Sequence, residues 1–359
     1  MAAGTTTRKE QQIPVEQAGY DTIASGLEVP WALAFAPDGR MFVTERPGRI
    51  RVIQKGVLAS KPWATLDVVA QGEAGLMGIA VAPDFASSRH VFVCATQRSG
   101  RQLVNRVIRL TDRDGAGVDP VVVVDGIPSA EFHAGDAVAF GPDGMLYVAT
   151  GDARSPGSAQ DAKSLAGKIL RFRPDGSIPA DNPKPGSPVY ASGVRNVQGL
   201  AWDPATGQLF ATDHGPSGFP SERFRQNNDE LNAIRAGANY GWPSVVGDSR
   251  NTRYAQPLVA WNPGIAPSGL AFYSGREATW RNTLFVASLK AEHLRRVTVA
   301  RDATRPAGWR VASEAVLFPE LGRVRAVAMG PDGALYFTTS NRDGRGVPRR
   351  GDDHVYRLR

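Results

Sequence analysis

Short apolar runs alternate with turn-forming residues along this chain, and no long amphipathic helical pattern interrupts them. In three places an apolar run leads into Pro-Asp-Gly and a second apolar run follows, over Trp31 to Thr44, Ala137 to Ala149 and Val324 to Thr338. Proline presets the first turn position, and glycine accepts the positive φ that the turn requires. Each of these segments therefore predicts a β-hairpin.

Three weaker copies of the same pattern fill the gaps between the clear ones. Their apolar second runs cover 91–93, 209–211 and 284–286. The six turns are marked by Pro37, Pro83, Pro142, Pro204, Gly275 and Pro331. A four-stranded propeller blade needs about 40 to 50 residues, so loop insertions account for the wider spacings. The pattern predicts an all-β fold, a six-bladed β-propeller of four-stranded antiparallel blades; a β-sandwich with coincidental turns is the alternative.

The two ends of the chain are expected to meet in one blade. Outer strands are predicted at 49–53, 168–172 and 354–358, and a strand near Tyr20 to Ala24 is expected to pair with the C-terminal strands, since an open sheet edge would otherwise remain. Residues 19–359 then form a single propeller domain. Residues 1–18 are predicted to be a disordered or artificially added N-terminal segment.

Composition and charge narrow the classes of protein that the chain can belong to. Hydrophobic residues make up 42% and charged residues 21%, which is typical of a packed globular protein. The net charge is +7, but the arginines are scattered singly, so we expect a solvated basic surface and no nucleic-acid partner. The one cysteine, Cys94, excludes an intramolecular disulfide and is expected to be buried.

The location of the protein is left open by the sequence. No apolar stretch reaches 18 residues, so no membrane span is expected. The first 12 residues are polar and lack the apolar centre of a signal peptide. The protein is therefore periplasmic or secreted if a leader has been removed, and cytoplasmic otherwise.

Polar residues at the edges of the hairpins are the candidates for chemistry, because function in a propeller gathers in the loops at one mouth of its channel. His133 stands at the start of the third hairpin, where it is either a base or a structural histidine. Arg195-Asn196 precedes the fourth, where it either binds an anion or braces a loop. Lys290 follows a strand of the fifth, and Arg323 and Arg325 enter the last on one side of the strand. If these cations all face the channel, they would bind a polyanionic small molecule.

A second group of residues suggests a metal. Asp213 lies beside the loop Gly215-Pro216, whose carbonyl oxygens are free of helix or strand pairing in the predicted fold, and Asp229-Glu230 follows. Oxygen ligands of this kind suit calcium.

Taken in order, these segments resemble the soluble pyrroloquinoline quinone-dependent sugar dehydrogenases, the aldose sugar dehydrogenase or glucose/sorbosone dehydrogenase family. The resemblance runs from about Gly26 to Leu358. The segments that carry it are Leu27 to Ala32, Gly72 to Gly78, His133, Arg195 to Trp202, His214 to Pro216, Asp229 to Asn232, Asn239 to Pro243, Ala266 to Gly269 and Gly322 to Arg325. The family is a six-bladed propeller, in agreement with the repeat count.

The resemblance implies a role for each matching residue. His133 would be the general base that takes the proton of a sugar's anomeric hydroxyl, while hydride passes to the quinone and a lactone forms. Glu73 would face the substrate. Arg195 and Asn196 would contact the quinone, with Arg195 stabilising the negative charge that develops on it.

The remaining matches imply cofactor and metal binding. Lys290, Arg323 and Arg325 would hold the carboxylates of pyrroloquinoline quinone. Gly215 and Pro216 would bind Ca²⁺ through their carbonyls beside the cofactor, and Glu230 would bind a second, structural Ca²⁺. The partners implied are an aldose and an unknown external electron acceptor, for a monomer or homodimer.

The chain departs from the family pattern directly after the base. The family usually reads Gly-Gly-Arg there, and this chain has Gly135-Asp136-Ala137. An added carboxylate and a missing arginine would raise the pKa of the base or change which sugars fit. Two other functions stay open, a calcium-dependent hydrolase such as a lactonase and a non-catalytic carbohydrate-binding propeller.

Overall fold

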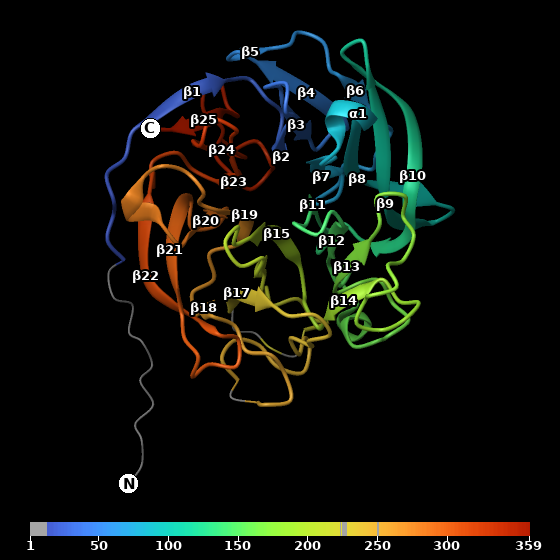
Figure 1. The fold of residues 1–359 in the computed structure, drawn as a ribbon, viewed down its shortest axis with the longest axis vertical. Coiled ribbons are helices and arrows are strands. Elements are labelled where there is room, and N and C mark those ends of the chain that lie inside the picture. Colours follow the sequence, from blue (N-terminus) through green and yellow to red (C-terminus); the bar gives the residue numbers. More distant parts are fainter. Residues whose placement is uncertain (1–12, 223, 225–227, 250) are drawn as a thin grey trace.

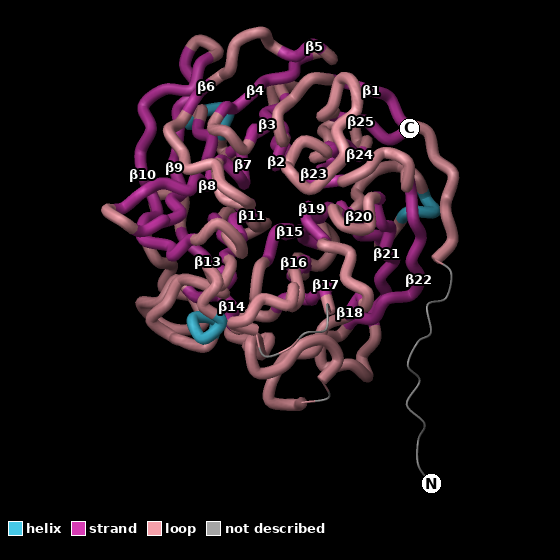
Figure 2. Tube along the Cα trace, turned by 180° about the vertical axis from the view of Figure 1, so that it is seen from behind, coloured by secondary structure: helices cyan, strands magenta, loops and turns pink. Residues whose placement is uncertain are grey.

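Six β-sheets surround a central axis in the computed structural model, which describes residues 13–222, 224, 228–249 and 251–359 and, of Asp136, the backbone alone. The sheets are arranged like the blades of a propeller (Figure 1). Seen from behind, the inner strands of all six border the central axis (Figure 2). The prediction of a six-bladed all-β propeller is confirmed.

Each blade is built from consecutive antiparallel strands, from the innermost outward. The first two blades contain β2 (Pro30–Phe35), β3 (Met41–Glu45), β4 (Arg49–Gln54), β5 (Val57–Leu58) and β6 (Ala64–Thr65), then β7 (Leu76–Val81), β8 (His90–Ser99), β9 (Gln102–Arg113) and β10 (Ala116–Ser129). The next two contain β11 (Gly135–Phe140), β12 (Leu146–Thr150), β13 (Lys168–Phe172) and β14 (Val189–Ser192), then β15 (Val197–Trp202), β16 (Leu209–Asp213), β17 (Asp229–Ile234) and β18 (Val259–Trp261). The fifth contains β19 (Pro267–Phe272), β20 (Thr283–Ser288), β21 (His293–Arg301) and β22 (Trp309–Leu317).

The sixth blade closes the ring with both ends of the chain. It contains β23 (Val324–Met329), β24 (Leu335–Thr339), β25 (Val355–Leu358) and, outermost, β1 (Tyr20–Ala24). Tyr20 lies opposite Leu358 in the β1–β25 register, and the Tyr20 ring packs edge-on against Tyr356 at 5.0 Å. The predicted closing strand at Tyr20 to Ala24 is present. Because β1 pairs with the outer edge of β25, it supplies the fourth strand of this blade.

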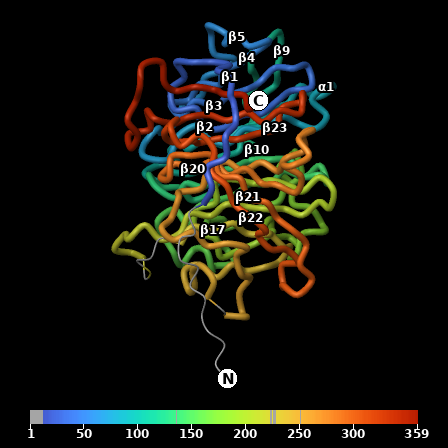
Figure 3. The backbone as a smooth tube through the Cα atoms, turned by 90° about the vertical axis from the view of Figure 1, so that its left-hand side faces the viewer, coloured from blue at the N-terminus to red at the C-terminus, as the bar shows by residue number. Residues whose placement is uncertain are grey.

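Residues 13–18 lie against the fifth blade (Figure 3). Val15 bridges Val316 of β22, and Glu16 pairs with Arg296 of β21 at 2.6 Å. The sequence predicts a disordered or added segment here; residues 13–18 are instead in contact with the propeller. Residues 1–12 of that segment lie outside the described residues.

Apolar side chains fill the spaces between neighbouring blades. Six clusters of buried hydrophobic residues each join two adjacent blades, so every blade is held on both sides. Phe285 and Phe337, for example, are fully buried in the cluster between the fifth and sixth blades. Burial of such a side chain stabilises the fold by roughly 1.5–3 kcal/mol. Cys94 of β8 is buried, as expected.

The inner strand of every blade has six residues and a shift in register near its first residues. Irregularities of this kind bend a strand and re-aim its side chains. The second residues of these strands are Trp31, Met77, Asp136, Gln198, Ser268 and Arg325. Among them Gln198 and Arg325 border the central channel, which has a volume of about 490 Å³. They also border a polar cavity at the end of this channel where the inner strands begin.

Helix is scarce in this protein. The helical segments of the described chain are α1 (Phe85–Ser88), η1 (Pro156–Ala159) and η2 (Ala278–Trp280). No described helix has the length and apolar character needed to cross a bilayer.

Candidate active site

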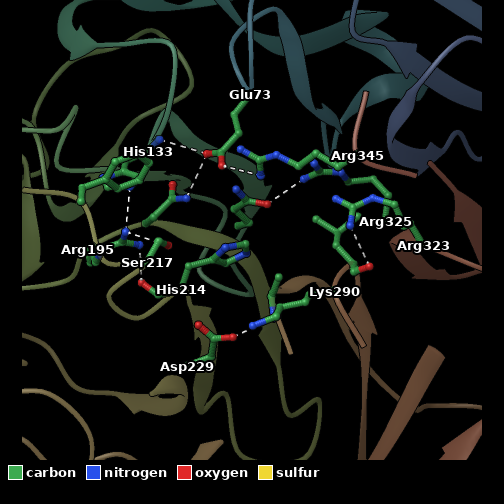
Figure 4. A pocket seen from close by; sticks show the side chains of 15 residues that line it. Glu73, His133, Arg195, His214, Ser217, Asp229, Lys290, Arg323, Arg325 and Arg345 are labelled. Carbon is green, nitrogen blue, oxygen red and sulfur yellow. Dashed lines mark hydrogen bonds and ion pairs between the residues drawn. The ribbon is translucent and has the colours of Figure 1, made fainter. Parts of the chain in front are cut away.

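A polar cavity of about 290 Å³ lies at the end of the channel where the inner strands begin (Figure 4). His133 comes just before β11, Arg195 and Asn196 directly before β15, and Arg323 directly before β23. Lys290 follows β20, a second strand, which runs in the opposite direction and therefore ends at the same face. The propeller thus brings these residues from four blades into one cavity.

His133 is held between a carboxylate and a guanidinium. Its Nδ1 lies 2.8 Å from Oδ1 of Asp152, and its Nε2 lies 2.8 Å from Nη2 of Arg195. A carboxylate only accepts hydrogen bonds, so Nδ1 carries the proton, and Nε2 accepts from Arg195. This is the tautomer in which the lone pair of Nε2 is available to take a proton.

Asp152 was not identified from the sequence, and its role follows from its contacts. It follows Gly151, whose backbone approaches His133 closely, because a Cβ at that position would lie 1.8 Å from the His133 carbonyl oxygen. Trp242 Nε1 donates to Asp152 Oδ2 at 2.8 Å, while Arg154 N donates to Oδ1 at 2.9 Å. Both carboxylate oxygens are therefore occupied, which fixes the orientation of the imidazole beside them.

Arg195 has a buried partner that the sequence also did not reveal. Its Nε donates to Oε1 of Glu222 at 2.7 Å, its Nη1 to the His214 carbonyl at 3.0 Å and its Nη2 to Ser217 Oγ at 3.1 Å. The other carboxylate oxygen of Glu222 accepts from the backbone of Ser217 and Phe219. The arginine and the loop over it therefore hold one another in place.

Glu73 and Asn196 connect His133 to the neighbouring blades. Glu73 Oε2 accepts from His133 N at 2.9 Å and from Asn196 Nδ2 at 3.1 Å. Asn196 Oδ1 in turn accepts from Gly135 N at 2.9 Å. The second oxygen of Glu73 lies 3.6 Å from Arg345, so this carboxylate stands between His133 and the cationic side of the cavity.

The opposite side of the cavity is cationic. Arg323 donates to Asp343 at 2.8 Å, and Arg325 donates to Gln198 Oε1 at 2.6 Å. The Nε of Arg325 is buried without a hydrogen-bond partner among the described residues, and burial lowers the pKa of this guanidinium to about 10. Lys290 is exposed and forms no ion pair with any described residue. This wall therefore has more positive charge than its own carboxylates neutralise.

His214 also lines the cavity and was not assigned a role from the sequence. Its Nε2 is buried without a partner in the described part of the chain. Burial lowers the pKa of its imidazole to about 4, so the ring is neutral near pH 7. It offers a neutral polar atom within a cationic cavity.

A much smaller cavity, of about 10 Å³, lies beside the first. Asp213 and Glu230 face one another across β16 and β17 and both border it, as does Gly215. Burial, with Glu230 as a neighbour, raises the pKa of Asp213 to about 7, and burial also raises the pKa of Glu230. Two buried carboxylates of this kind repel one another when both are ionised, and a cation beside them would offset that repulsion.

The predicted residues thus divide between the two cavities. Glu73, His133, Arg195, Asn196, Lys290, Arg323 and Arg325 border the larger one, whereas Gly215 and Glu230 border the smaller. Pro216 borders neither. No cluster of three or more His, Cys, Asp or Glu side chains with metal-binding geometry occurs among the described residues. The side chain of Asp136, which the sequence places near His133, lies outside what the structure describes.

Residues 27–349 match the sequence model of the glucose/sorbosone dehydrogenase family. The chain belongs to this family. The six-bladed propeller that the resemblance to glucose/sorbosone dehydrogenases implied is the fold that the structure has.

Individual relatives of this family are similar over nearly the whole chain. The aldose sugar dehydrogenase YliI of Escherichia coli is 32% identical and covers 90% of this chain and 90% of its own. A structure of a putative oxidoreductase (glucose dehydrogenase) from Thermus thermophilus is 45% identical with a TM-score of 0.86, covering 96% of this chain and all of its own. The PQQ-bound aldose sugar dehydrogenase of Streptomyces coelicolor is 36% identical with a TM-score of 0.83, covering 96% and 99%.

Proposed function

We propose that this protein is a sugar dehydrogenase that oxidises aldoses at the anomeric carbon to the lactone, with pyrroloquinoline quinone as its cofactor. The observation that carries the proposal is a histidine in its basic tautomer on one side of a cavity whose other side is cationic. In the reaction the sugar loses a proton from its anomeric hydroxyl and a hydride from the anomeric carbon. When bound, the quinone supplies the two-electron acceptor, which an external acceptor then re-oxidises.

The donor set of the cavity fits a tricarboxylate such as this cofactor. Lys290, Arg323 and Arg325 come from two neighbouring blades and border the same wall. The unpartnered Nε of Arg325 is a buried donor that an anionic ligand would satisfy. A volume of about 290 Å³ is close to the lower limit of about 300 Å³ for small-molecule sites. A carbohydrate-binding propeller or a hydrolase would have no need for this set of cations.

The chain's own residues prepare the proton transfer. Asp152 holds the Nδ1 proton, so that Nε2 of His133 accepts the proton of the sugar hydroxyl and the carboxylate stabilises the imidazolium that forms. Arg195 donates to Nε2 in the structure and must yield this position to the hydroxyl. Because its Nη2 also reaches Ser217 Oγ, Arg195 keeps a partner and its charge stays beside the reacting atoms.

Calcium is the second part of the proposal. Asp213 and Glu230 are suited to hold Ca²⁺ in the smaller cavity, with the backbone near Gly215 as a further source of oxygen ligands. A Cβ on Gly215 would lie 2.0 Å from the Asn228 carbonyl oxygen, so only glycine fits there. A periplasmic or secreted location is likewise a proposal.

The test is dye reduction by purified protein supplied with pyrroloquinoline quinone and Ca²⁺, with D-glucose and other aldoses as substrates. We expect aldose-dependent reduction and a change in the quinone's absorbance on binding. His133→Ala should abolish turnover, whereas His90→Ala, which removes a half-buried histidine outside the cavity, is the matched control. Absence of both signals would refute the proposal, and lactone hydrolysis without dye reduction would favour the hydrolase.

A further inference from the structure

An exposed arginine packs on a residue that borders the cavity, and its side chain forms no hydrogen bond or ion pair with any described residue. Arg154 follows Asp152, the partner of the base, by two positions, and its guanidinium lies 4.9 Å from the centroid of the Phe219 ring. Phe219 itself borders the cavity and packs edge-on against the His133 ring at 5.4 Å. One aromatic ring therefore separates the unpaired charge from the base.

The backbone at this arginine is strained. Ala153 has a φ of 50° and Arg154 a φ of 60°, so two consecutive residues with side chains occupy the left-handed region. Such conformations are unfavourable outside glycine and persist where the surrounding structure enforces them, commonly at functional sites. Here Asp152 enforces the turn, because its Oδ1 accepts from Arg154 N.

The aromatic surface under Arg154 is itself fixed. Phe219 stacks on Phe132 at 5.9 Å, and Phe219 N donates to Glu222, the carboxylate that binds Arg195. A guanidinium stacked on a ring keeps its N–H groups free at its edge. Arg154 is thus a preorganised donor for an anion. The other ring of this stacked pair, Phe132, has Arg345 over it, but the charge of Arg345 is partly offset by Glu73 at 3.6 Å.

Resting on the proposed function, we propose that Arg154 selects aldoses that carry an anionic group, a carboxylate or a phosphate, at the end of the sugar remote from the anomeric carbon. In this proposal a hexose with its anomeric hydroxyl at His133 Nε2 extends past Phe219, which borders the cavity and packs on the His133 ring. A guanidinium there binds a carboxylate or phosphate through paired hydrogen bonds. Arg154 is then a determinant of specificity and takes no part in the proton transfer.

The experiment compares sugars that differ only at C6: D-glucose, D-glucuronate and D-glucose 6-phosphate. For the PQQ-loaded protein we expect kcat/KM to be higher for an anionic sugar than for D-glucose. The anionic sugar with the higher kcat/KM shows whether Arg154 prefers a carboxylate or a phosphate. Arg154→Gln should lower the ratio of anionic to neutral kcat/KM by about tenfold, Arg154→Lys should restore part of it, and added salt should reduce it. Arg101→Gln, at an exposed arginine between β8 and β9, removes the same charge away from the cavity and should leave the ratio unchanged.

Two outcomes would overturn the inference. The first is a wild-type protein whose kcat/KM is no higher for either anionic sugar than for D-glucose. The second is an Arg154→Gln variant in which kcat/KM falls equally for neutral and anionic sugars, which would make Arg154 only a support for Phe219. Calorimetry with methyl β-D-glucuronide and methyl β-D-glucoside, which have no free anomeric hydroxyl, separates this inference from the reaction. If the glucuronide binds in an Arg154-dependent way while none of the free sugars is oxidised, the anion site is supported and the proposed function fails.

Discussion

At the scale of single residues, the site depends on polar partners that are remote in sequence from the groups they serve. His133 was evident as a candidate because it precedes a hairpin, but Asp152 lies 19 residues further along. Arg195 was evident for the same reason, and Glu222 lies 27 residues beyond it. No local pattern distinguishes these two carboxylates from the other acidic residues of the chain, since only the folded blades bring them to their partners.

Asp152→Asn should lower kcat with little change in KM. An amide can donate to Nδ1 and thereby favour the imidazole tautomer that has its proton on Nε2, which cannot act as a base. In a comparable Asp–His pair the loss is on the order of 10⁴-fold, and we expect at least 10²-fold here. Steady-state dye reduction measures it, with a thermal melt to show that the variant is folded. A folded variant with unchanged kcat would show that Asp152 does not set the tautomer.

Lys168 gives a pH dependence of stability with a definite sign. Its ammonium is buried and donates to the carbonyls of Ser158, Ala159 and Ala166, and burial lowers its pKa from 10.5 to about 8. Between pH 8 and 10.5 the unfolded chain therefore binds more protons than the native state, so the contribution of this residue to stability rises with pH. Below pH 8 the cost of burying the charge is present in full.

The measurement is the free energy of unfolding in urea at pH 7.5 and 9.5. The wild type should gain stability over this interval relative to Lys168→Met. Lys163→Met, which removes an exposed lysine from the loop before β13, should show the same change with pH as the wild type. An equal change in the free energy of unfolding between pH 7.5 and 9.5 for all three proteins would contradict the lowered pKa of Lys168.

At the scale of elements, the hairpins were predictable because their turns are encoded locally. Pro-Asp-Gly at residues 37–39, 142–144 and 331–333 fixes each turn through backbone preferences alone, and all three hairpins are present. The register shifts near the start of each inner strand were not predictable. They arise from packing around the channel, and no residue type marks them, as the second residues Trp31 and Ser268 illustrate.

The close approach of the chain before β11 and after β12 is a feature that a single methyl group should disturb. Gly151→Ala would place a Cβ 1.8 Å from the His133 carbonyl oxygen, so the segment that carries His133 must move. We expect a loss of about 1–3 kcal/mol in stability and a fall in kcat. Gly157→Ala, in η1, has no atom within 4 Å of its new Cβ and is the control. Thermal unfolding measures the stability and dye reduction measures kcat. Equal Tm and equal kcat for the two variants would contradict the steric conflict at Gly151.

At the scale of the whole molecule, six inter-blade clusters make a ring in which each blade depends on both neighbours. The sixth blade depends in addition on the pairing of β1 with β25, which also places Arg359 N 2.9 Å from the Gly19 carbonyl. The number of blades followed from repeat counting, and the closing strand followed from the need to pair the open edge of the last blade. The contacts of residues 13–18 did not, because Val15 and Glu16 lack any strand pattern and are held by β21 and β22.

Deleting residues 1–24 should destabilise the ring much more than deleting residues 1–18. The longer deletion removes β1, exposes the edge of β25 and uncovers Phe318 and Tyr356, against which the Tyr20 ring packs. The shorter one keeps β1 and, among the described residues, loses the contacts of residues 13–18, which include the bond from Val316 N to the Pro14 carbonyl and the packing of Ala18. Thermal melts and light scattering should show a lower Tm and association for the longer deletion alone. Equal Tm values would mean that β1 does not close the ring.

The common length of the six inner strands has a use beyond this protein. Since each has six residues and its irregularity begins at its first residue, counting from the start of the inner strand locates the equivalent residue of every blade. Substitutions at Trp31, Gln198 and Arg325 can therefore be aligned blade against blade within one chain, as though they were variants of a single position. A library that exchanges side chains among these positions would sample new channel floors without altering a single turn.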